Sequence, residues 1–189
     1  MFEETIYQVG EFCLFRETNK TEVLGQITKI LPRVALKNRE SLPMLKVQWF
    51  YSKHDLLALI RQDLQDEEAL LIADNEVFST SHSDRVFADA IVRKAKVFSF
   101  DQYLQQDAET RQSAFFSRAG LVYQKLHPPI SEWSHSCKCK RPLNPDLQFV
   151  LCADCQAAHH LKCTGYTAKT LQLKGNKFQC QQCRLLASD

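Results

Sequence analysis

The C-terminal part of the chain contains cysteine and histidine residues at short, regular intervals. Seven of the eight cysteines lie beyond residue 136, and with one histidine they follow the pattern C-x-C, twelve residues, C-x2-C, four residues, H-x2-C, sixteen residues, C-x2-C. The eight residues are Cys137, Cys139, Cys152, Cys155, His160, Cys163, Cys180 and Cys183. Eight ligands fill two tetrahedral zinc shells with none left over. The pattern therefore predicts two structural zinc ions.

Two alternatives to zinc are free buried thiols and an iron–sulfur cluster. Free thiols are disfavoured because a segment of about 50 residues buries too little apolar surface to fold without a metal. An iron–sulfur cluster is disfavoured by the histidine and the paired spacing. His159 is an adjacent candidate ligand, but only His160 keeps the H-x2-C step.

The overall composition is that of a globular protein with one or two domains. The chain has 189 residues, of which 44% are hydrophobic and 24% charged, and this excludes a disordered or fibrous protein. The longest apolar runs, such as residues 69–73, are far shorter than the about 20 residues that cross a membrane. The N-terminus is acidic and lacks the pattern of a signal peptide. We therefore expect an intracellular protein without a membrane span.

Charge and proline mark a boundary between two parts of the chain. Residues 1–133 contain 16 basic and 19 acidic residues, whereas residues 134–189 contain 8 basic and 3 acidic ones. Pro128 and Pro129, close to this change in charge, disfavour helix. We predict a first domain over residues 1–127, a linker over 128–135 and a zinc finger over 136–187.

The first domain has the pattern of a mainly β protein with helical insertions. Segments rich in β-branched and aromatic residues predict strands at 12–16, 23–30, 45–51, 76–78 and 96–100. Leu56, Ile60 and Leu64 recur every four residues and predict a helix over 54–68. A short helix is expected from Asp101, as N-cap, to Asp107. Cys13, between two apolar residues on a strand, is expected to be buried rather than reactive.

The order of the metal ligands resembles that of a PHD finger. In a RING finger the histidine is the fourth of eight ligands, whereas here four cysteines precede His160. The resemblance implies a cross-brace, in which ligands one, two, five and six hold one zinc ion. Cys137, Cys139, His160 and Cys163 would hold the first ion. Cys152, Cys155, Cys180 and Cys183 would hold the second.

The first domain resembles a BAH (bromo-adjacent homology) domain. The similarity lies in residues 7–14, 26–30, 47–51, 75–84 and 96–100, followed by 114–118. The resemblance implies a distorted β-barrel on the N-terminal side of the finger. This order of domains is the architecture of plant and fungal readers of repressive chromatin. The fingers of those proteins begin with C-x-C, then a proline and Asn-Pro-Asp, and here these are Pro142 and residues 144–146.

The resemblance also implies a histone-binding site. In BAH readers of histone H3 trimethylated at lysine 27, aromatic residues matching Trp49 and Tyr51 form a cage, and residues matching His82 and Asp84 contact the peptide. The third cage aromatic falls at or near Val23, which offers no π face. Two residues apart on a strand, Trp49 and Tyr51 project from one face and can attract a quaternary ammonium. Alternatively, Trp49 and Tyr51 are ordinary core aromatics, and His82 and Asp84 form a local turn.

The zinc finger lacks two aromatic positions that PHD readers of trimethylated lysine 4 use. Ala158 stands two residues before the ligand histidine, where those fingers have tryptophan, and Leu143 replaces a tyrosine of the first loop. Three uses of the finger remain open. They are structural or protein docking, binding of an unmodified tail along residues 148–151 with Asp154, and contact of this basic finger with DNA.

No pattern in the sequence supports an enzyme. Only five glycines are present, without a phosphate-binding loop or a G-x-S-x-G elbow, and full zinc shells leave no open position for catalysis. We expect a nuclear, non-enzymatic module of a repressive gene-regulatory complex that binds the histone H3 tail and other subunits. The alternative is a scaffold subunit that uses both domains for protein or DNA contacts with a degenerate cage.

Overall fold

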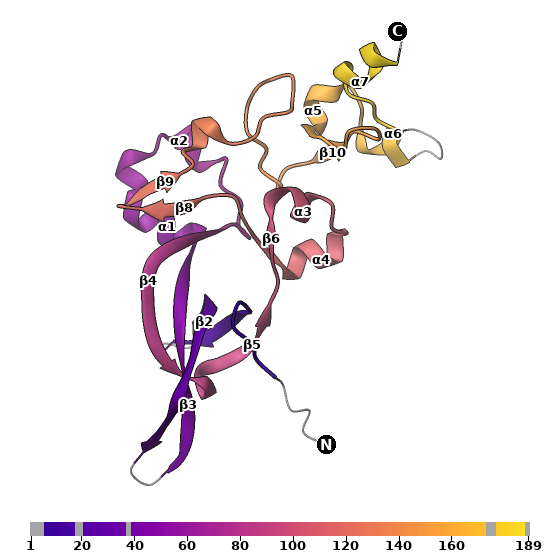
Figure 1. Cartoon of the computed structure of the whole chain (residues 1–189). Helices are drawn as coiled ribbons and strands as arrows, with labels where there is room; N and C mark the ends of the chain where they lie inside the picture. Colours follow the sequence, from indigo (N-terminus) through magenta and orange to yellow (C-terminus); the bar gives the residue numbers. More distant parts are fainter. Residues whose placement is uncertain (1–5, 18–20, 37–38, 173–176, 188–189) are drawn as a thin grey trace. The chain divides into compact units, whose positions relative to one another are not determined.

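The computed structural model describes residues 6–17, 21–36, 39–172 and 177–187 (Figure 1). By its internal contacts the chain divides into two compact units. Unit 1 comprises Met1–Asp63 and Asn75–Pro128, and unit 2 comprises Leu64–Asp74 and Pro129–Asp189. Each unit is described separately below. The predicted domain boundaries at 127 and 136 stay a prediction.

Unit 1 is built on a seven-stranded, mostly antiparallel sheet with the strand order β5-β1-β2-β3-β4-β8-β9. Long, curved β2, β3 and β4 form its centre (Figure 1). The strands are β1 (Phe12–Arg16), β2 (Glu22–Leu36), β3 (Arg39–Ser52), β4 (Val77–Phe87), β5 (Ile91–Ala95), β8 (Gly120–Val122) and β9 (Lys125–His127). A separate parallel pair joins β6 (Val97–Ser99) to β7 (Phe115–Ser117). This mainly β architecture confirms the predicted fold class.

Alternating side chains place two apolar clusters on either side of the strands. One buried cluster contains Cys13, Phe15, Ile27, Leu45 and Val47, and the other contains Leu14, Leu24 and Val77. Neighbours in the sequence fall into different clusters because successive side chains of a strand point to opposite faces. Cys13 is fully buried, as predicted.

Strand β4 has an irregularity that faces Trp49 of β3. Gln48 pairs with Ser83 and Phe50 pairs with Ser79, so residues 80–82 together lie opposite one residue. The Thr80 hydroxyl donates a hydrogen bond to the Trp49 carbonyl oxygen, 2.9 Å away, which holds this irregular stretch against β3. The irregularity brings the strand segment that carries His82 and Asp84 next to Trp49.

The helices between β3 and β7 differ from the prediction in their bounds. The predicted helix over 54–68 is wrong as one element, because α1 (Lys53–Ile60) passes into a 3-10 turn (Arg61–Asp63). Gln65 then begins α2 (Asp66–Ala69) with its own capping box. The predicted helix over 101–107 is likewise replaced by two short helices. Ser99 caps α3 (Phe100–Leu104) and Asp107 caps α4 (Ala108–Ser113), because their side chains accept N–H bonds of the first turns.

A buried ion pair lies in the interior of unit 1. The Arg118 guanidinium donates to both carboxylate oxygens of Glu76, at 2.7 and 3.0 Å, and Glu76 is completely buried. Burial lowers the pKa of Arg118, whereas the neighbouring Glu76 carboxylate raises it. The rings of Phe100 and Phe116 lie 4.4 and 5.8 Å from the guanidinium carbon. This pairing allows two charges to be buried in the interior of unit 1.

The C-terminal part of unit 2 contains a small antiparallel pair and short helices. Strand β10 (Phe149–Leu151) pairs with β11 (Ala158–His160), and the helices are α5 (Leu161–Thr164), α6 (Ala168–Gln172) and α7 (Gln181–Leu186). Its apolar cluster is small and contains Cys152, Phe178 and Cys180, with Tyr166 edge-on to Phe178. So small a core agrees with the expectation that metal supplies much of the folding free energy.

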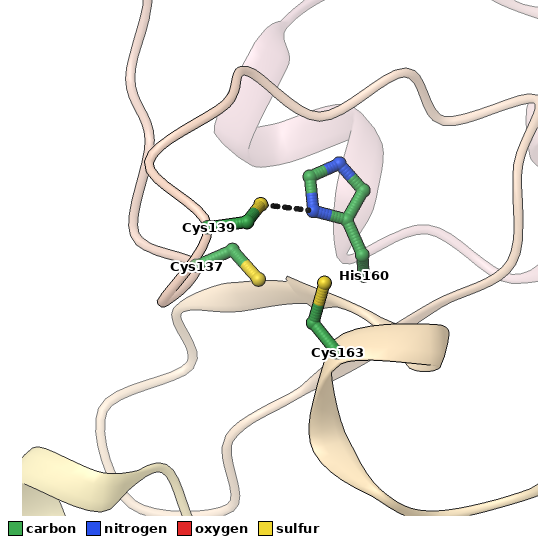
Figure 2. Close-up of side chains that lie close together, drawn as sticks. All are labelled: Cys137, Cys139, His160 and Cys163. Atoms are coloured by element: carbon green, nitrogen blue, oxygen red, sulfur yellow. Dashed lines mark hydrogen bonds between the residues drawn. The ribbon is translucent and has the colours of Figure 1, made fainter.

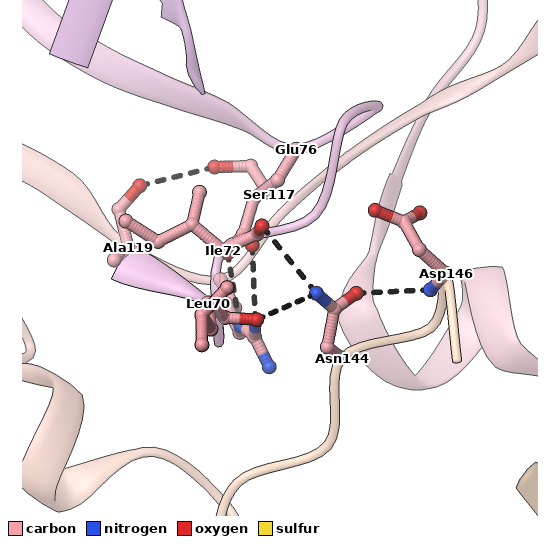
Figure 3. A network of polar contacts seen from close by, with 8 residues as sticks. Leu70, Ile72, Glu76, Ser117, Ala119, Asn144 and Asp146 are labelled. Carbon is pink, nitrogen blue, oxygen red and sulfur yellow. Dashed lines mark hydrogen bonds and ion pairs between the residues drawn. The ribbon is translucent and has the colours of Figure 1, made fainter. Parts of the chain in front are cut away.

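Residues 64–74 belong to unit 2, although the residues on both sides belong to unit 1. The buried Asn144 side chain donates from Nδ2 to the carbonyl oxygens of Leu70 and Ile72, 2.9 and 3.5 Å away (Figure 3). Its Oδ1 accepts from the Asp146 backbone, and the Asp146 carboxylate accepts from the Asp74 backbone. The Asn-Pro-Asp sequence therefore holds residues 64–74 against the finger.

Within the residues that the structure describes, no helix combines the length and apolar character required to span a membrane.

Candidate metal centres and a candidate peptide pocket

Tight turns shape the C-x-C segment at Cys137 and the C-x2-C segment at Cys152. The Lys140 N–H donates to the Cys137 carbonyl oxygen at 2.9 Å, and the Gln156 N–H donates to that of Cys152 at 3.0 Å. Lys140 and Gln156 both adopt positive φ angles, 53° and 58°. Such a turn folds the chain back so that both cysteines of a pair face the same point.

The first cluster brings together Cys137, Cys139, His160 and Cys163 (Figure 2). Their ligand atoms all lie within 4.8 Å of one another, and Cys139 Sγ is 3.3 Å from His160 Nδ1. Sulfur ligands about 2.3 Å from a tetrahedral ion lie about 3.8 Å apart. The four side chains therefore fit one zinc ion, with His160 offering Nδ1.

The second cluster brings together Cys152, Cys155, Cys180 and Cys183, again within 4.8 Å. Cys155 Sγ and Cys180 Sγ are 3.8 Å apart, the spacing of a tetrahedral zinc shell. The Cys152 sulfur also accepts the Cys180 backbone N–H. These are the two interleaved sets of four that the PHD resemblance implies, and they are sites for two structural zinc ions.

The thiol pKa values in the first cluster favour the binding of a cation. Burial raises the pKa of Cys137. Hydrogen bonds from the backbone and side chain of Cys139 and from His160 have the larger, opposite effect and lower this pKa to about 6. Burial and the neighbouring Cys137 raise the pKa of Cys163 to about 11. One thiolate forms easily and a second beside it is repelled. A divalent ion removes that repulsion, which is why such clusters bind zinc as thiolates.

His159 lies outside both clusters. It is buried, its ring packs edge-on against Phe178 at 5.2 Å, and among the described residues its Nε2 has no hydrogen-bond partner. Adjacent residues of β11 point to opposite faces, so only one of the two histidines can face the metal. The geometry selects His160.

A surface pocket of about 500 Å³ lies over the sheet of unit 1. Every candidate histone-binding residue lines it, and so does Val23 of the expected third wall. Its lining consists of Phe15, Arg16, Glu17, Val23, Trp49, Phe50, Tyr51, Asp55, His82, Asp84, Val86 and Ala90. Trp49 and Tyr51 are both half-buried, so neither ring is sealed inside the core. The pocket joins residues from four strands and the start of α1.

Asp84 links two of the candidate residues. Its Oδ2 accepts a hydrogen bond from Trp49 Nε1 at 3.0 Å and lies 3.0 Å from His82 Nε2. The side chains of His82 and Asp84 are each 55% exposed, so both can still contact a ligand. The bond to Asp84 fixes the tilt of the indole ring.

Phe15 and Gly25 pack against the Trp49 ring and hold its position. Phe15 is 1% exposed and packs edge-on against the indole, with ring centroids 5.3 Å apart. A Cβ on Gly25 would lie 2.3 Å from Val47 Cγ1 and 3.1 Å from Trp49 Cε3. Only glycine therefore fits opposite Trp49 without displacing the ring.

Sequence reasoning missed two acidic residues of the pocket, Glu17 and Asp55. The backbone N–H and hydroxyl of Ser52 both donate to Asp55 Oδ2, at 2.9 and 2.7 Å, which forms the first-turn cap of α1. The spacing Ser-x-x-Asp is the signature of this cap and could have placed Asp55 beside Tyr51. Glu17 accepts a hydrogen bond from the Thr21 hydroxyl. No local pattern indicated its place in the pocket.

The finger carries aliphatic residues at two positions that are aromatic in PHD readers of trimethylated lysine 4. Leu143 and Ala158, at the two positions where aromatic residues would stand, are 4% and 9% exposed. Phe149 is half-buried on β10, and Asp154 accepts a hydrogen bond from the Gln179 side chain.

Comparison with known proteins identifies both domains. The BAH domain family matches residues 5–124, and the PHD-finger family matches residues 137–183. The chain belongs to the BAH family and carries a PHD finger. It is similar to the chromatin remodeling protein SHL of Arabidopsis thaliana, with 30% identity over 178 residues, 93% of this chain and 72% of that protein.

A solved structure is also similar. The BAH domain of yeast Rsc2 matches with a TM-score of 0.42 and 19% identity, covering 64% of this chain and 48% of that chain. The family assignment confirms the BAH and PHD resemblances found in the sequence. Both domains are binding modules typical of chromatin proteins, and neither is a catalytic family.

Proposed function

We propose that this BAH-PHD protein is a nuclear, non-enzymatic reader of a methylated lysine on the histone H3 tail, with lysine 27 as the leading candidate. The main support is the shared pocket that brings Trp49, Tyr51, His82 and Asp84 together. Two half-buried rings in one open pocket can receive a quaternary ammonium by cation–π attraction, at roughly 0.5–2 kcal/mol per ring.

The charges of the pocket support a cationic ligand. Glu17, Asp55 and Asp84 line it, against one permanently charged base, Arg16. Carboxylates beside a partly desolvated cage attract a methylated ammonium, because this group keeps its positive charge. An acidic or neutral peptide side chain would gain nothing from the same groups.

The finger is proposed to act as a zinc-stabilised docking element. Its buried Leu143 and Ala158 supply no aromatic face at two cage positions, whereas β10 could still pair with an extended chain. The name of the Arabidopsis relative, a chromatin remodeling protein, supports work within a larger chromatin complex, and we propose a repressive one. Contact of the basic finger with DNA is part of the same proposal.

One observation favours the scaffold alternative. Val23 occupies the wall where a third aromatic ring would stand, and within the described residues Phe15 and Phe50 do not replace it. Phe15 is buried, and Phe50 packs edge-on against Phe12 in the other apolar cluster. In this alternative the protein holds complex subunits together and does not read a mark.

A histone-peptide array on the purified 189-residue chain separates the two functions. The reader proposal predicts signal on H3 peptides methylated at lysine 27 and its loss in Trp49→Ala. Val23→Tyr should strengthen the signal by about five- to tenfold, since one ring of about 1–1.4 kcal/mol is restored.

Gly25→Ala provides a second probe, because a Cβ there collides with Val47 and displaces the Trp49 ring. Lys138→Ala on the exposed finger surface is the control and should leave tail binding unchanged. If folded Trp49→Ala binds the peptides as well as the parent does, the reader proposal fails and the scaffold function replaces it.

A further inference from the structure

Three basic side chains stand in a row across the centre of the sheet of unit 1. Lys29 of β2 is the direct partner of Lys46 on β3, and Lys46 is the direct partner of Arg85 on β4. All three residues are exposed. We call these three residues the basic row. Neighbouring strands lie about 4.8 Å apart, so the row spans about 10 Å.

A bulge in β2 places Lys29 in this row. Ile27 pairs with Val47 and Lys29 pairs with Lys46, so Thr28 is an extra residue on β2. The Thr28 hydroxyl donates to the Lys46 carbonyl oxygen at 3.0 Å and ties the bulge to β3. Without the extra residue, Thr28 itself would stand opposite Lys46 and Lys29 would point to the other face.

The structure shows no direct ionic partner for the three charges among the described residues. Within the described residues none of the three side chains makes an ion pair or a hydrogen bond. On the same face of the sheet, the nearest cross-strand rows on either side contain no carboxylate; they are Gln26–Gln48–Ser83 and Leu31–Met44–Phe87. Like charges directly opposite one another destabilise a sheet. The repulsion within the row thus opposes folding.

We propose that the basic row is a binding surface for the phosphate backbone of duplex DNA. Its members are long, flexible cations without a pocket or an aromatic ring among them, which suits recognition of charge rather than of sequence. Duplex DNA carries one negative charge per about 1.7 Å of axis. An acidic peptide offers at most one per about 3.3 Å of extended chain. The denser polyanion relieves the repulsion within the row better.

The basic row and the Trp49 pocket lie on opposite faces of the same strands. Lys46 alternates with the buried Leu45 and Val47, and Trp49 lies on the face of Val47. DNA on one face would therefore leave the pocket on the other face open. This inference does not depend on tail binding, and its test uses no histone peptide.

The test measures the affinity of the full chain for a random-sequence duplex over a range of salt concentrations. Each neutralised phosphate contributes about 0.9 to the slope of log K against log salt. In the test, glutamine replaces Lys29, Lys46 and Arg85 one, two and three at a time. The magnitude of the slope should fall stepwise, by about 2.7 in the triple variant.

Lys96→Gln with Lys125→Gln is the matched control, because it removes two charges from exposed positions of unit 1 outside the row. It should keep the parental slope, whereas Lys29→Gln with Lys46→Gln should lose about 1.8. Lys46→Gln removes the repulsion and should therefore raise the midpoint temperature of thermal unfolding. Such a rise would show that the variant loses DNA binding without losing its fold.

Three results would overturn the proposal. One is a parental salt slope in the triple variant, and another is an equal loss in the matched control. The third is no duplex binding by the parent at low salt together with row-dependent binding of RNA or an acidic peptide.

Discussion

The indole Nε1–H of Trp49 donates a hydrogen bond to Oδ2 of Asp84, 3.0 Å away and 35 residues later in the chain. The same oxygen lies 3.0 Å from His82 Nε2. The bond exists because the irregular stretch of β4 at residues 80–82 lies opposite Trp49. One carboxylate therefore positions the aromatic wall of the pocket and also supplies it with negative charge.

Asp84→Ala should weaken binding of a methylated H3 peptide about two- to tenfold. The variant loses one hydrogen bond, worth about 0.5–1.5 kcal/mol, and frees the Trp49 ring to turn. Calorimetric titration measures the affinity, and tryptophan fluorescence reports the ring. Asp101→Ala, an exposed carboxylate at the start of α3, is the control. An unchanged affinity in the Asp84 variant would exclude a role of this carboxylate in the pocket.

Removal of zinc should unfold the finger and leave unit 1 folded. Elemental analysis should find two zinc ions per chain, and Cys155→Ser should behave like treatment with a chelator, because each cluster needs all four ligands. Cys13→Ala, outside the finger, should keep both ions. Circular dichroism and limited proteolysis follow the two units separately. A content near one ion, or none, in the parent would contradict the paired clusters.

Asn144→Ala should release residues 64–74 from the finger. The substitution leaves the carbonyl oxygens of Leu70 and Ile72 without their donor, at a cost of about 1–3 kcal/mol. Hydrogen exchange of amides in this segment should therefore accelerate by roughly five- to a hundredfold. Gln148→Ala, an exposed side chain of the same finger, is the control. Equal protection in both variants would mean that other contacts hold the segment.

The finger should not prefer an H3 peptide trimethylated at lysine 4 over the unmodified one. Leu143 and Ala158 are buried and apolar, so two of the faces that would contact a trimethylammonium are missing, each worth on the order of a kcal/mol. Paired titrations of both peptides measure the preference. To keep the Trp49 pocket out of the result, they are repeated in Trp49→Ala. A tenfold preference for the methylated peptide in that variant would contradict the prediction.

The sequence predicted local features well because their causes are local. The C-x-C, C-x2-C and H-x2-C steps reveal the ligands directly, and strand alternation places Trp49 and Tyr51 on one face. The resemblance to PHD fingers supplied the interleaving of the two clusters, which spacing alone does not determine.

Features that depend on long-range contacts were not predictable in the same way. The docking of residues 64–74 on Asn144 joins segments more than 70 residues apart, and the helix predicted over 54–68 breaks where this docking begins. Its apolar period was real at Leu56 and Ile60, which are buried in unit 1. Leu64 instead belongs to unit 2. The basic row likewise depends on strand register and on the bulge at Thr28, which no pattern in the sequence marks.

The central claim is that the Trp49 pocket binds the positive charge of a methylated lysine. The most direct test titrates the chain with two H3 peptides that differ at lysine 27, one carrying trimethyllysine and one its neutral isostere, in which carbon replaces the ammonium nitrogen. Shape and apolar area are the same in both, so the affinity ratio isolates the charge. We predict about five- to thirtyfold tighter binding of the charged peptide, from two rings at roughly 0.5–1 kcal/mol each. Equal affinity for the two peptides would contradict the account.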